Sequence, residues 1–335
     1  MTMKPRNGQV MVTGAGGFVG SRLCEALAAQ RRPFVPVTRH DLPGSEVAVG
    51  EIGPATDWSQ ALAGCRVVVH LAARVHVTRH SAAGALADYR RVNVEGTLNL
   101  ARQAAAAGVA RFVFISSIKV NGESTDGRGP FSPDDPAAPG DAYAVSKLRA
   151  EQGLMALARE TGMEVVIIRP PLVHGPGVKG NFASMLRWVR SGLPLPLGAV
   201  ENNRRSLLAL DNLVDLIVTC LDHPAAGNDV FLAADDEDLS TASLLQRIAD
   251  SMEAPVRLVN IPPSLLELVA AMTGKRGVAQ RLCGSLQIDV SRTRERLGWV
   301  PRVSVDEGLR RTVQAFDDSQ SRERTRFARV WPRHP

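Results

Sequence analysis

Residues 10–20 read VMVTGAGGFVG, and this stretch decides the fold. Its first three residues are apolar in succession, as in a strand that is buried on both faces. Three glycines follow at spacings of three, Gly14, Gly17 and Gly20, and residues 21–30 then have the apolar periodicity of a helix. A strand, a glycine turn and a helix in this order are the context in which a dinucleotide-binding fingerprint is expected.

Each glycine of this turn has a separate physical reason. Gly14 permits the tight turn out of the strand, and Gly17, which lacks a Cβ atom, lets a pyrophosphate approach the backbone. Gly20 lets the following helix pack close to the sheet. The first-turn N–H groups and the positive end of the helix then face the pyrophosphate. An ordinary glycine-rich turn has the same composition, so the fingerprint needs support from elsewhere in the chain.

The overall composition is that of a globular protein. The chain has 335 residues, of which 44% are hydrophobic and 22% charged, enough for two domains or one enlarged domain. The formal net charge is +6, and the last fourteen residues contain Arg322, Arg324, Arg326, Arg329 and Arg333. This basic tail, residues 319–335, is either a solvated terminus or a weak contact for an anionic partner or membrane surface. No basic patch is interleaved with aromatic residues, so a nucleic-acid partner is not expected.

The four cysteines, Cys24, Cys65, Cys220 and Cys283, lie far apart in the sequence. Because no zinc or redox spacing is present, we expect buried thiols in a reducing compartment and no metal site. No apolar run reaches the ~18 residues that a membrane span needs, and the N-terminal residues lead straight into the first strand. The expectation is a cytoplasmic protein without a transmembrane segment.

Short apolar runs alternate with helical segments through the first half of the chain. Strands are predicted at residues 34–38, 66–71, 111–116 and 164–169, and helices at 57–62, 83–107 and 141–161. Repeated strand–helix units with doubly buried strands predict an α/β Rossmann fold, that is, a doubly wound parallel sheet with helices on both faces.

The character of the sequence changes after Pro171. Residues 175–182 and 192–203 are loop-like, a helix is predicted at 211–221 and a strand at 229–233, and helices with proline-rich joints follow. We expect a dinucleotide-binding domain over residues 1–170, to which residues 204–235 return. Residues 171–203 and 236–318 would form a smaller, mainly helical substrate-binding domain.

Two residues of the helix predicted at 141–161 suit acid–base chemistry. Tyr143 and Lys147 lie four residues apart and hence on one face of that helix. Ser117 follows the strand predicted at 111–116, and ligands of an open α/β sheet bind beyond the carboxyl ends of its strands. A tyrosine, whose reference pKa is ~10, becomes useful near neutral pH when a lysine ammonium favours its phenolate. Such a pair also occurs by chance on many helices, but with the glycine turn it predicts a catalytic site.

These motifs resemble those of the extended short-chain dehydrogenase/reductase family, NAD-dependent epimerase/dehydratase type. Within that family they resemble the nucleotide-sugar 4-epimerases and 4-keto reductases, over residues 10–316. TGAGGFVG at 13–20 is similar to the family's TGxxGxxG, YAVSK at 143–147 to its YxxxK, and ISSIKVNG at 115–122 to its strand-end serine segment. The resemblance implies that Ser117, Tyr143 and Lys147 are catalytic.

The resemblance also implies which residues contact the cofactor. HLAA at 70–73 is similar to the segment that passes beside the dinucleotide, and VNVEGT contains the family's asparagine. RPP at 169–171 with VHGPG at 173–177 is similar to RPxxVYGPG, with His174, like Asn121, standing where tyrosine is usual. The implied cofactor contacts are Gly14, Gly17, Phe18, Val19, Gly20, Arg39, Leu71, Ala72, Ala73, Asn93, Tyr143, Lys147 and Pro170.

The end of the second predicted strand bears on the choice of cofactor. NAD binders commonly carry an acid there for the ribose 2′-hydroxyl, whereas an arginine accommodates a 2′-phosphate. Thr38 stands at the acid position and Arg39 follows it. Because a guanidinium holds a phosphate through several N–H donors, the sequence favours NADP(H) over NAD(H). A merely solvated Arg39 is the alternative, and the nearby Asp41 complicates the choice.

Four residues of the second half resemble the nucleotide-diphosphate contacts of sugar epimerases: Lys179, Asn181, Arg204 and Arg281. Cationic groups that converge on a diphosphate supply charge-assisted hydrogen bonds, although each of them alone is equally an ordinary surface charge. Residues 123–140 form a loop that would cover the sugar, and His76 is either a sugar contact or a structural histidine. The expected partners are a UDP-sugar substrate and a second copy of the chain in a homodimer.

We therefore expect an oxidoreductase that acts at C4 of a UDP-hexose in surface-polysaccharide precursor synthesis, as the resemblance implies. Arg39 favours a UDP-4-keto-sugar 4-reductase over a UDP-glucose or UDP-N-acetylhexosamine 4-epimerase with retained NAD. A reductase of a small non-nucleotide ketone is disfavoured by the arginines of the second half. A non-catalytic dinucleotide-binding redox sensor is disfavoured because Tyr143 and Lys147 are both present.

Overall fold

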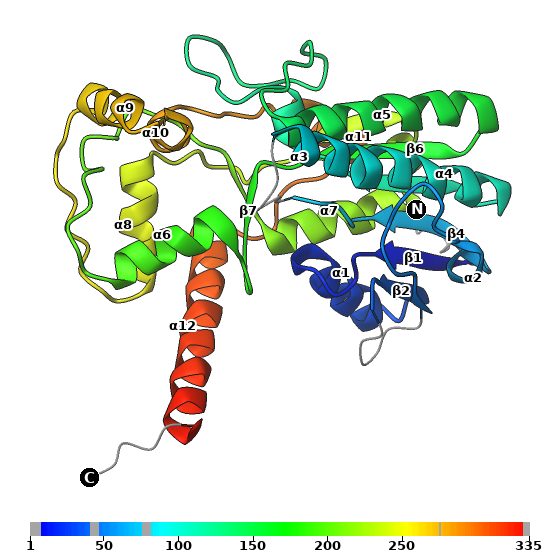
Figure 1. Cartoon of the computed structure of the whole chain (residues 1–335), viewed down its shortest axis with the longest axis horizontal. Coiled ribbons are helices and arrows are strands. Elements are labelled where there is room, and N and C mark those ends of the chain that lie inside the picture. Colours follow the sequence, from blue (N-terminus) through cyan, green and yellow to red (C-terminus); the bar gives the residue numbers. More distant parts are fainter. Residues whose placement is uncertain (1–7, 41–46, 76–81, 275, 331–335) are drawn as a thin grey trace.

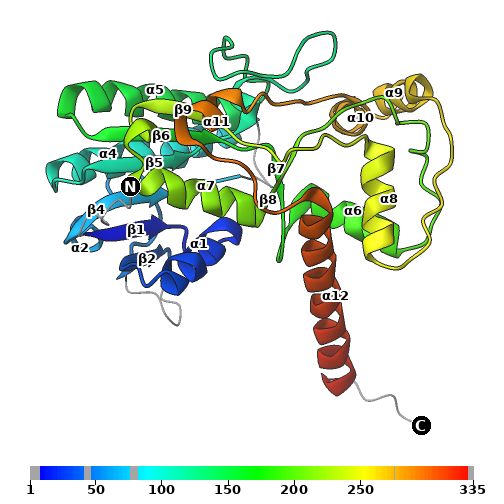
Figure 2. The ribbon, with the colours of Figure 1, turned by 180° about the vertical axis from the view of Figure 1, so that it is seen from behind.

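A seven-stranded parallel sheet forms the centre of the protein in the computed structural model, which describes residues 8–40, 47–75, 82–274 and 276–330. The strand order is β3-β2-β1-β4-β5-β6-β9, and every neighbouring pair runs parallel. Helices cover both faces of the sheet (Figures 1 and 2). The predicted α/β Rossmann fold is confirmed.

The strands of this sheet are short and mostly buried. They are β1 (Gln9–Thr13), β2 (Phe34–Thr38), β3 (Val47–Ala48), β4 (Cys65–His70), β5 (Arg111–Ile115), β6 (Glu164–Arg169) and β9 (Asp229–Leu232). Three of the predicted strands end or begin one residue away from the observed ones. The two-residue β3 was not predicted, because so short a strand has no periodicity to recognise.

Two hydrophobic clusters pack on opposite faces of the sheet, and alternate residues of β1 serve each of them. Val10 and Val12 face the cluster that includes α1 (Phe18–Ala29) and α7 (Leu210–Asp222). Met11 faces the cluster that includes α2 (Ser59–Leu62), α4 (Thr97–Ala106) and α5 (Ala142–Thr161). This alternation explains why the strands read as continuous apolar runs.

The second half of the chain builds a smaller, mainly helical part with a cluster of its own. β7 (Leu172–His174) and β8 (Leu207–Ala209) pair in parallel, beside α6 (Gly180–Arg190), α8 (Thr241–Ser251) and α12 (Val305–Val330). α9 (Pro263–Met272) and α10 (Arg276–Cys283) pack on each other at the end farthest from the sheet (Figures 1 and 2). α11 (Ser291–Leu297) returns to contact β9.

Several local expectations need correction. The single helix predicted at 83–107 is divided into α3 (Ala82–Tyr89), a π-helical segment (Arg90–Gly96) and α4, and sequence periodicity does not distinguish these. Residues 180–182 are not a loop but the first turn of α6. Two 3₁₀ turns, Ile118–Val120 and Pro224–Ala226, complete the elements among the described residues.

The cysteines and the basic tail also differ from expectation. None of the four thiols forms a disulfide. Cys65 and Cys220 are buried, whereas Cys24 and Cys283 are half-buried because they lie at the margins of their clusters. Helix α12 continues through residue 330, so most of the tail is helical in its backbone. Across the described residues, no helix has the length and apolar character that a membrane crossing would demand.

Candidate active site

The glycine turn after β1 has the geometry that a pyrophosphate site needs. Gly14 has φ +67°, and a Cβ atom there would lie 3.0 Å from the backbone nitrogen of Ala72. Gly17 caps α1 without any side-chain hydrogen bond, which leaves the first-turn amides of Phe18 and Val19 without a side-chain acceptor at that end. A Cβ atom on Gly20 would lie 2.1 Å from the carbonyl oxygen of Gly14, so only glycine permits this approach.

A buried polar network ties the ends of β1 and β4 together. Thr13 Oγ1 lies 2.8 Å from His70 Nδ1 and accepts the backbone N–H groups of Leu71 and Ala72. Since Thr13 Oγ1 accepts two N–H groups, its own proton points to His70 Nδ1, and the His70 Nε2–H then donates to Thr97 Oγ1 at 3.0 Å. Burial lowers the pKa of His70 to about 3, so the ring is neutral and its tautomer is fixed. The network therefore sets the path of residues 71–73 beside the glycine turn.

The π-helical segment turns Asn93 into the same region. Asn93 Oδ1 accepts the backbone N–H of Arg74, and its Nδ2 donates to the carbonyl oxygen of Arg74 and to Ser146 Oγ. Ser146 Oγ in turn donates to the carbonyl oxygen of Tyr143 at 2.7 Å. Extra-residue turns of this kind often lie at functional sites. Asn93 thus links the segment after β4 to the helix that carries Tyr143.

Two contacts hold the start of α5 against the end of β5. Lys147 Nζ donates to the carbonyl oxygen of Ile115 at 2.7 Å, two residues before Ser117. Lys119 Nζ, two residues after Ser117, donates to Asp141 Oδ2 at 2.7 Å, and Asp141 caps α5 through the backbone N–H of Ala144. These contacts bracket Ser117 and Tyr143, so the structure brings the three predicted catalytic residues to one edge of the sheet.

The electrostatics of this trio differ from the sequence-based expectation. Lys147 Nζ lies 4.4 Å from the centre of the Phe114 ring and 5.9 Å from that of Tyr143. Burial lowers the pKa of Lys147 to about 7, with Glu151 opposing this shift. The pKa of Tyr143 is not lowered but raised, first by burial and then by the charge of Asp141. Burial is the largest cause of this shift, and Lys147 is not among its causes, so the sequence-based expectation of a lowered tyrosine pKa does not describe the site without its ligands.

Two further groups lie at the same edge. Ser116 Oγ is buried and has no hydrogen-bond partner among the described residues, so its hydroxyl is available to a bound group. Ser117 Oγ accepts a long hydrogen bond from the backbone N–H of Lys119, at 3.3 Å. The carbonyl oxygen of Pro170 accepts the backbone N–H of Ile118, which fixes the serine turn on the end of β6. The residues present therefore suit a nicotinamide dinucleotide laid across the ends of these strands.

The end of β2, which bears on the choice between NAD(H) and NADP(H), favours NADP(H) less clearly than the sequence indicates. Thr38 Oγ1 donates a hydrogen bond to the carbonyl oxygen of His40. Arg39 Nη1 lies 3.7 Å from Glu51 Oε1, and the two side chains are 63% and 59% exposed. Glu51, just beyond β3, thus supplies a carboxylate that the sequence places thirteen residues after Thr38. A carboxylate suits a ribose hydroxyl and an arginine suits a phosphate, so this pair weakens the preference for NADP(H).

The arginine that accompanies Arg281 is Arg205 rather than Arg204. Arg204 is exposed, and its Nη1 donates to the carbonyl oxygens of Glu201 and Asn203. Arg205 is half-buried, donates to the carbonyl oxygen of Gly284 at 2.8 Å, and is close enough to Arg281 for their charges to interact. Burial lowers the pKa of Arg205, and Asp126 of the 123–140 loop opposes that shift.

The remaining expected substrate residues fall into two groups. Lys179 and Asn181 are exposed at the N-terminus of α6. His76 lies outside the described residues.

The two departures from the family pattern are structural residues. Asn121 is buried, donates to the carbonyl oxygen of Ser132 and accepts from Arg169, whose guanidinium also binds Glu151. His174 is fully buried, stacks on Phe182 and lies 3.2 Å from Thr312 Oγ1. Neither residue is placed by these contacts to touch a sugar.

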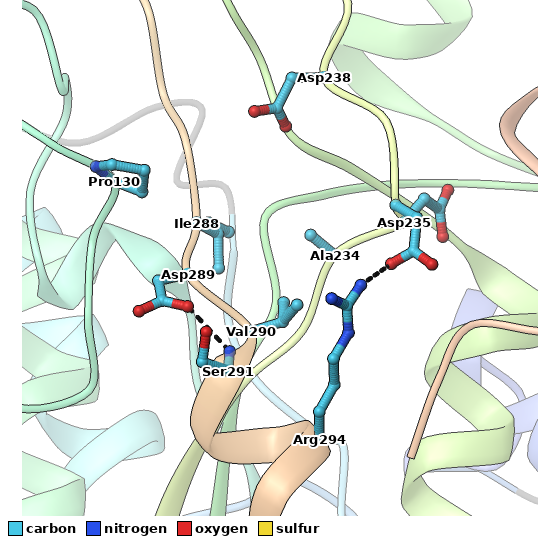
Figure 3. Close-up of a pocket in the computed structure, with 10 residues that line it drawn as sticks. Pro130, Ala234, Asp235, Asp238, Ile288, Asp289, Val290, Ser291 and Arg294 are labelled. Carbon is cyan, nitrogen blue, oxygen red and sulfur yellow. Dashed lines mark hydrogen bonds and ion pairs between the residues drawn. The ribbon is translucent and has the colours of Figure 1, made fainter. Parts of the chain in front are cut away.

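A separate hollow of about 360 Å³ lies beyond the end of β9 (Figure 3). Carboxylates dominate its lining, and Arg294 pairs with one of them, Asp236. None of the predicted site residues lines this hollow. Among the described residues, no group of three or more His, Cys, Asp or Glu side chains is arranged to hold a metal ion. Pro130 of the 123–140 loop lines the hollow, so it adjoins the loop that was expected to cover the sugar.

The site combines a glycine turn at a helix N-terminus with a Tyr–Lys pair on a helix that packs against the end of β5. This combination defines the class of nicotinamide-dependent short-chain dehydrogenases/reductases. Residues 10–234 match the model of the NAD dependent epimerase/dehydratase family. The chain belongs to this family and is an enzyme that uses a nicotinamide dinucleotide.

Known relatives agree with this assignment. The chain is 46% identical over 317 residues to a UDP-glucose 4-epimerase of Vibrio cholerae, which covers 93% of this chain and 97% of that protein. It is 28% identical over 331 residues to an N-acetyl-alpha-D-glucosaminyl-diphospho-ditrans,octacis-undecaprenol 4-epimerase of Escherichia coli O157:H7, covering 92% of this chain and 95% of that protein. The solved structure of MoeE5 in complex with UDP-glucose and NAD is similar with a TM-score of 0.75 and 26% identity, over 93% of this chain and 100% of that one.

Proposed function

We propose that the enzyme interconverts the C4 epimers of a UDP-linked hexose with a retained NAD. The observation that carries this proposal is the position of Tyr143 and Lys147 against the strand end that bears Ser117. The similarity to the UDP-glucose 4-epimerase of Vibrio cholerae supports the substrate class. The pairing of Arg39 with Glu51 supports NAD, because a 2′-phosphate would have to compete with that carboxylate.

The dinucleotide would be held by the groups already described. Gly14, Gly17 and the first turn of α1 suit its pyrophosphate, whereas Ser116 Oγ and Lys147 suit its nicotinamide end. A nicotinamide bound there would supply reversible hydride transfer at C4, which the inversion of that carbon requires.

The side chains of the enzyme move and hold the proton. The raised pKa of Tyr143 keeps its hydroxyl protonated at neutral pH, ready to donate to the C4 oxygen of a ketone. In the oxidative direction the phenolate must accept the C4 hydroxyl proton, and the adjacent charge of Lys147 favours that form. Ser117 would donate a hydrogen bond to the C4 oxygen, where negative charge develops.

Arg205 and Arg281 would bind the diphosphate of the substrate, with Lys179 and Asn181 at the exposed end of α6 as further contacts. Both named epimerase relatives act on sugars that are attached through a diphosphate, which supports this choice. In this proposal Arg205 takes the role that the sequence had given to Arg204, because Arg205 is half-buried with its charge close to Arg281, whereas Arg204 is exposed.

The test is to incubate the purified enzyme with UDP-glucose without added cofactor and to follow UDP-galactose by chromatography. Interconversion to equilibrium without net redox, and NAD released on heating the protein, are expected. Tyr143→Phe is the control and should be inactive. Absence of interconversion by an enzyme that has been loaded with NAD would refute the proposal.

A 4-keto reductase that uses NADPH is the second candidate, and Arg39 is the observation that favours it. Its contact with Glu51 is long and both side chains are largely exposed, so the guanidinium is free to turn to a 2′-phosphate. Oxidation of NADPH by a UDP-4-keto-hexose, with no UDP-galactose formed from UDP-glucose, would select this function.

A further inference from the structure

Helix α9 exposes a stripe of apolar side chains to solvent. Leu265, Leu268, Val269 and Met272 are 47 to 79% exposed, and their spacing of i, i+3, i+4 and i+7 places them on one face of the helix. No residue of α9 is buried. Of the eleven large apolar residues that are exposed among the described residues, these four and Val278 of α10 lie within one hairpin. A concentration of this kind marks an interaction surface.

The hairpin formed by α9 and α10 lies at the periphery of the molecule, where an extended flat surface can approach it. α9 packs against α10, and Leu266 of α9 with Leu282 and Cys283 of α10 packs against the cluster of the smaller part. The pair forms the corner of the molecule farthest from the sheet, in both views (Figures 1 and 2). With ten residues α9 is about 15 Å long, so it can lie on a bilayer but cannot cross it.

The charges around the stripe select an anionic partner. Arg276 is exposed at the start of α10, four residues after Met272. Arg257 and Val259 are both exposed, and in an extended segment residues two apart share a face. Glu267 is the single acidic residue between positions 255 and 283. A second copy docked through the same stripe would bring these arginines toward one another, whereas anionic lipid headgroups would neutralise them.

We propose that the α9–α10 hairpin binds the surface of a membrane that contains anionic phospholipid, with the stripe of α9 in the headgroup region and Arg257 and Arg276 against lipid phosphates. Apolar side chains with flanking arginines are the combination by which interfacial helices bind membranes. α10 also carries Arg281, so binding would hold the nucleotide-sugar site at the membrane surface. This proposal does not depend on the proposed epimerase activity.

The test is sedimentation of the full chain with vesicles of phosphatidylcholine, with and without phosphatidylglycerol. We expect binding to the anionic vesicles, weakened about tenfold by Leu268→Asp, since a charge replaces a half-exposed leucine in the headgroup region. Arg276→Gln should weaken it about fivefold, which is ~1 kcal/mol for one arginine near an anionic surface. The matched control is Val300→Asp, an equally exposed valine (54%) outside the hairpin, which should bind like the parent.

Three outcomes would overturn the proposal. They are no sedimentation of the parent with anionic vesicles, equal binding of Leu268→Asp and the parent, and an equal loss in Leu268→Asp and Val300→Asp. Conversion of a dimeric parent to monomers by Leu268→Asp would instead assign the stripe to a second copy. Should Leu268→Asp lower the Tm, the more exposed Met272→Asp replaces it, and its outcomes decide in the same way.

Discussion

Replacement of Arg205 by alanine tests whether the second half of the chain binds a nucleotide diphosphate. Arg205 and Arg204 are adjacent in sequence, carry the same charge and differ in placement. Arg205 is half-buried and its charge interacts with that of Arg281, whereas Arg204 is exposed. The proposal therefore predicts a large effect for Arg205→Ala and a small one for Arg204→Ala.

The magnitude follows from the hydrogen bonds that Arg205 has available. A guanidinium has five N–H donors, and one of those of Arg205 is taken by the carbonyl oxygen of Gly284. A hydrogen bond to a charged group contributes about 1.5–3 kcal/mol. Loss of one such bond to the diphosphate should weaken UDP binding by roughly 10- to 150-fold. The diphosphate takes no part in the redox chemistry, so the loss should appear in KM rather than in kcat.

The assay is isothermal titration of UDP into the parent and both variants, together with steady-state kinetics. Arg204→Ala should bind UDP within a few-fold of the parent, and the salt dependence of binding should fall only in Arg205→Ala. Arg205→Lys keeps the charge and checks that the loss is not due to the broken contact with Gly284. Equal effects of the two alanine variants, or a parent that binds no UDP at millimolar concentration, would refute the reasoning.

Three further predictions concern the catalytic and cofactor residues. Tyr143→Phe should lose ~10²–10⁴-fold in turnover with the dinucleotide still bound, whereas Tyr89→Phe loses only a hydrogen bond to a backbone carbonyl and should stay within a few-fold in the same assay. Burial lowers the pKa of Lys147 to about 7. Between about pH 7 and 10 the unfolded chain therefore binds more protons than the folded one, and the contribution of this group to the free energy of unfolding rises with pH over that window. The Tm advantage of Lys147→Met over the parent should therefore be largest below about pH 7 and shrink toward pH 10, and a constant difference would contradict the shift. Arg39→Ala should weaken NADPH binding by ~1.5–3 kcal/mol and leave NADH binding nearly unchanged if the arginine contacts a 2′-phosphate; calorimetry showing an equal loss for both would exclude that contact.

The buried network around Thr13 shows where prediction from the sequence stops. Its members Thr13, His70 and Thr97 are all visible in the motifs, but the contacts of Thr13 join residues up to 59 positions apart. Similarly, Glu51 was not recognised as a partner of Arg39, because the carboxylate comes from beyond a two-residue strand that leaves no pattern. The pKa of Tyr143 could not be predicted from the sequence either. Its shift depends on how completely elements from distant parts of the chain bury the ring.

The sequence by itself determined the features whose causes are local. Apolar runs with glycines at fixed spacing specify the first strand, its turn and its helix, and a spacing of four places Tyr143 and Lys147 on one face of α5. Only the tertiary structure decided which of two adjacent arginines accompanies Arg281, which group dominates the pKa of Tyr143, and that the stripe of α9 is exposed. A periodic apolar face is the same in sequence whether it packs on a core or lies in solvent. Its exposure depends on contacts made by distant segments, and no local pattern records them.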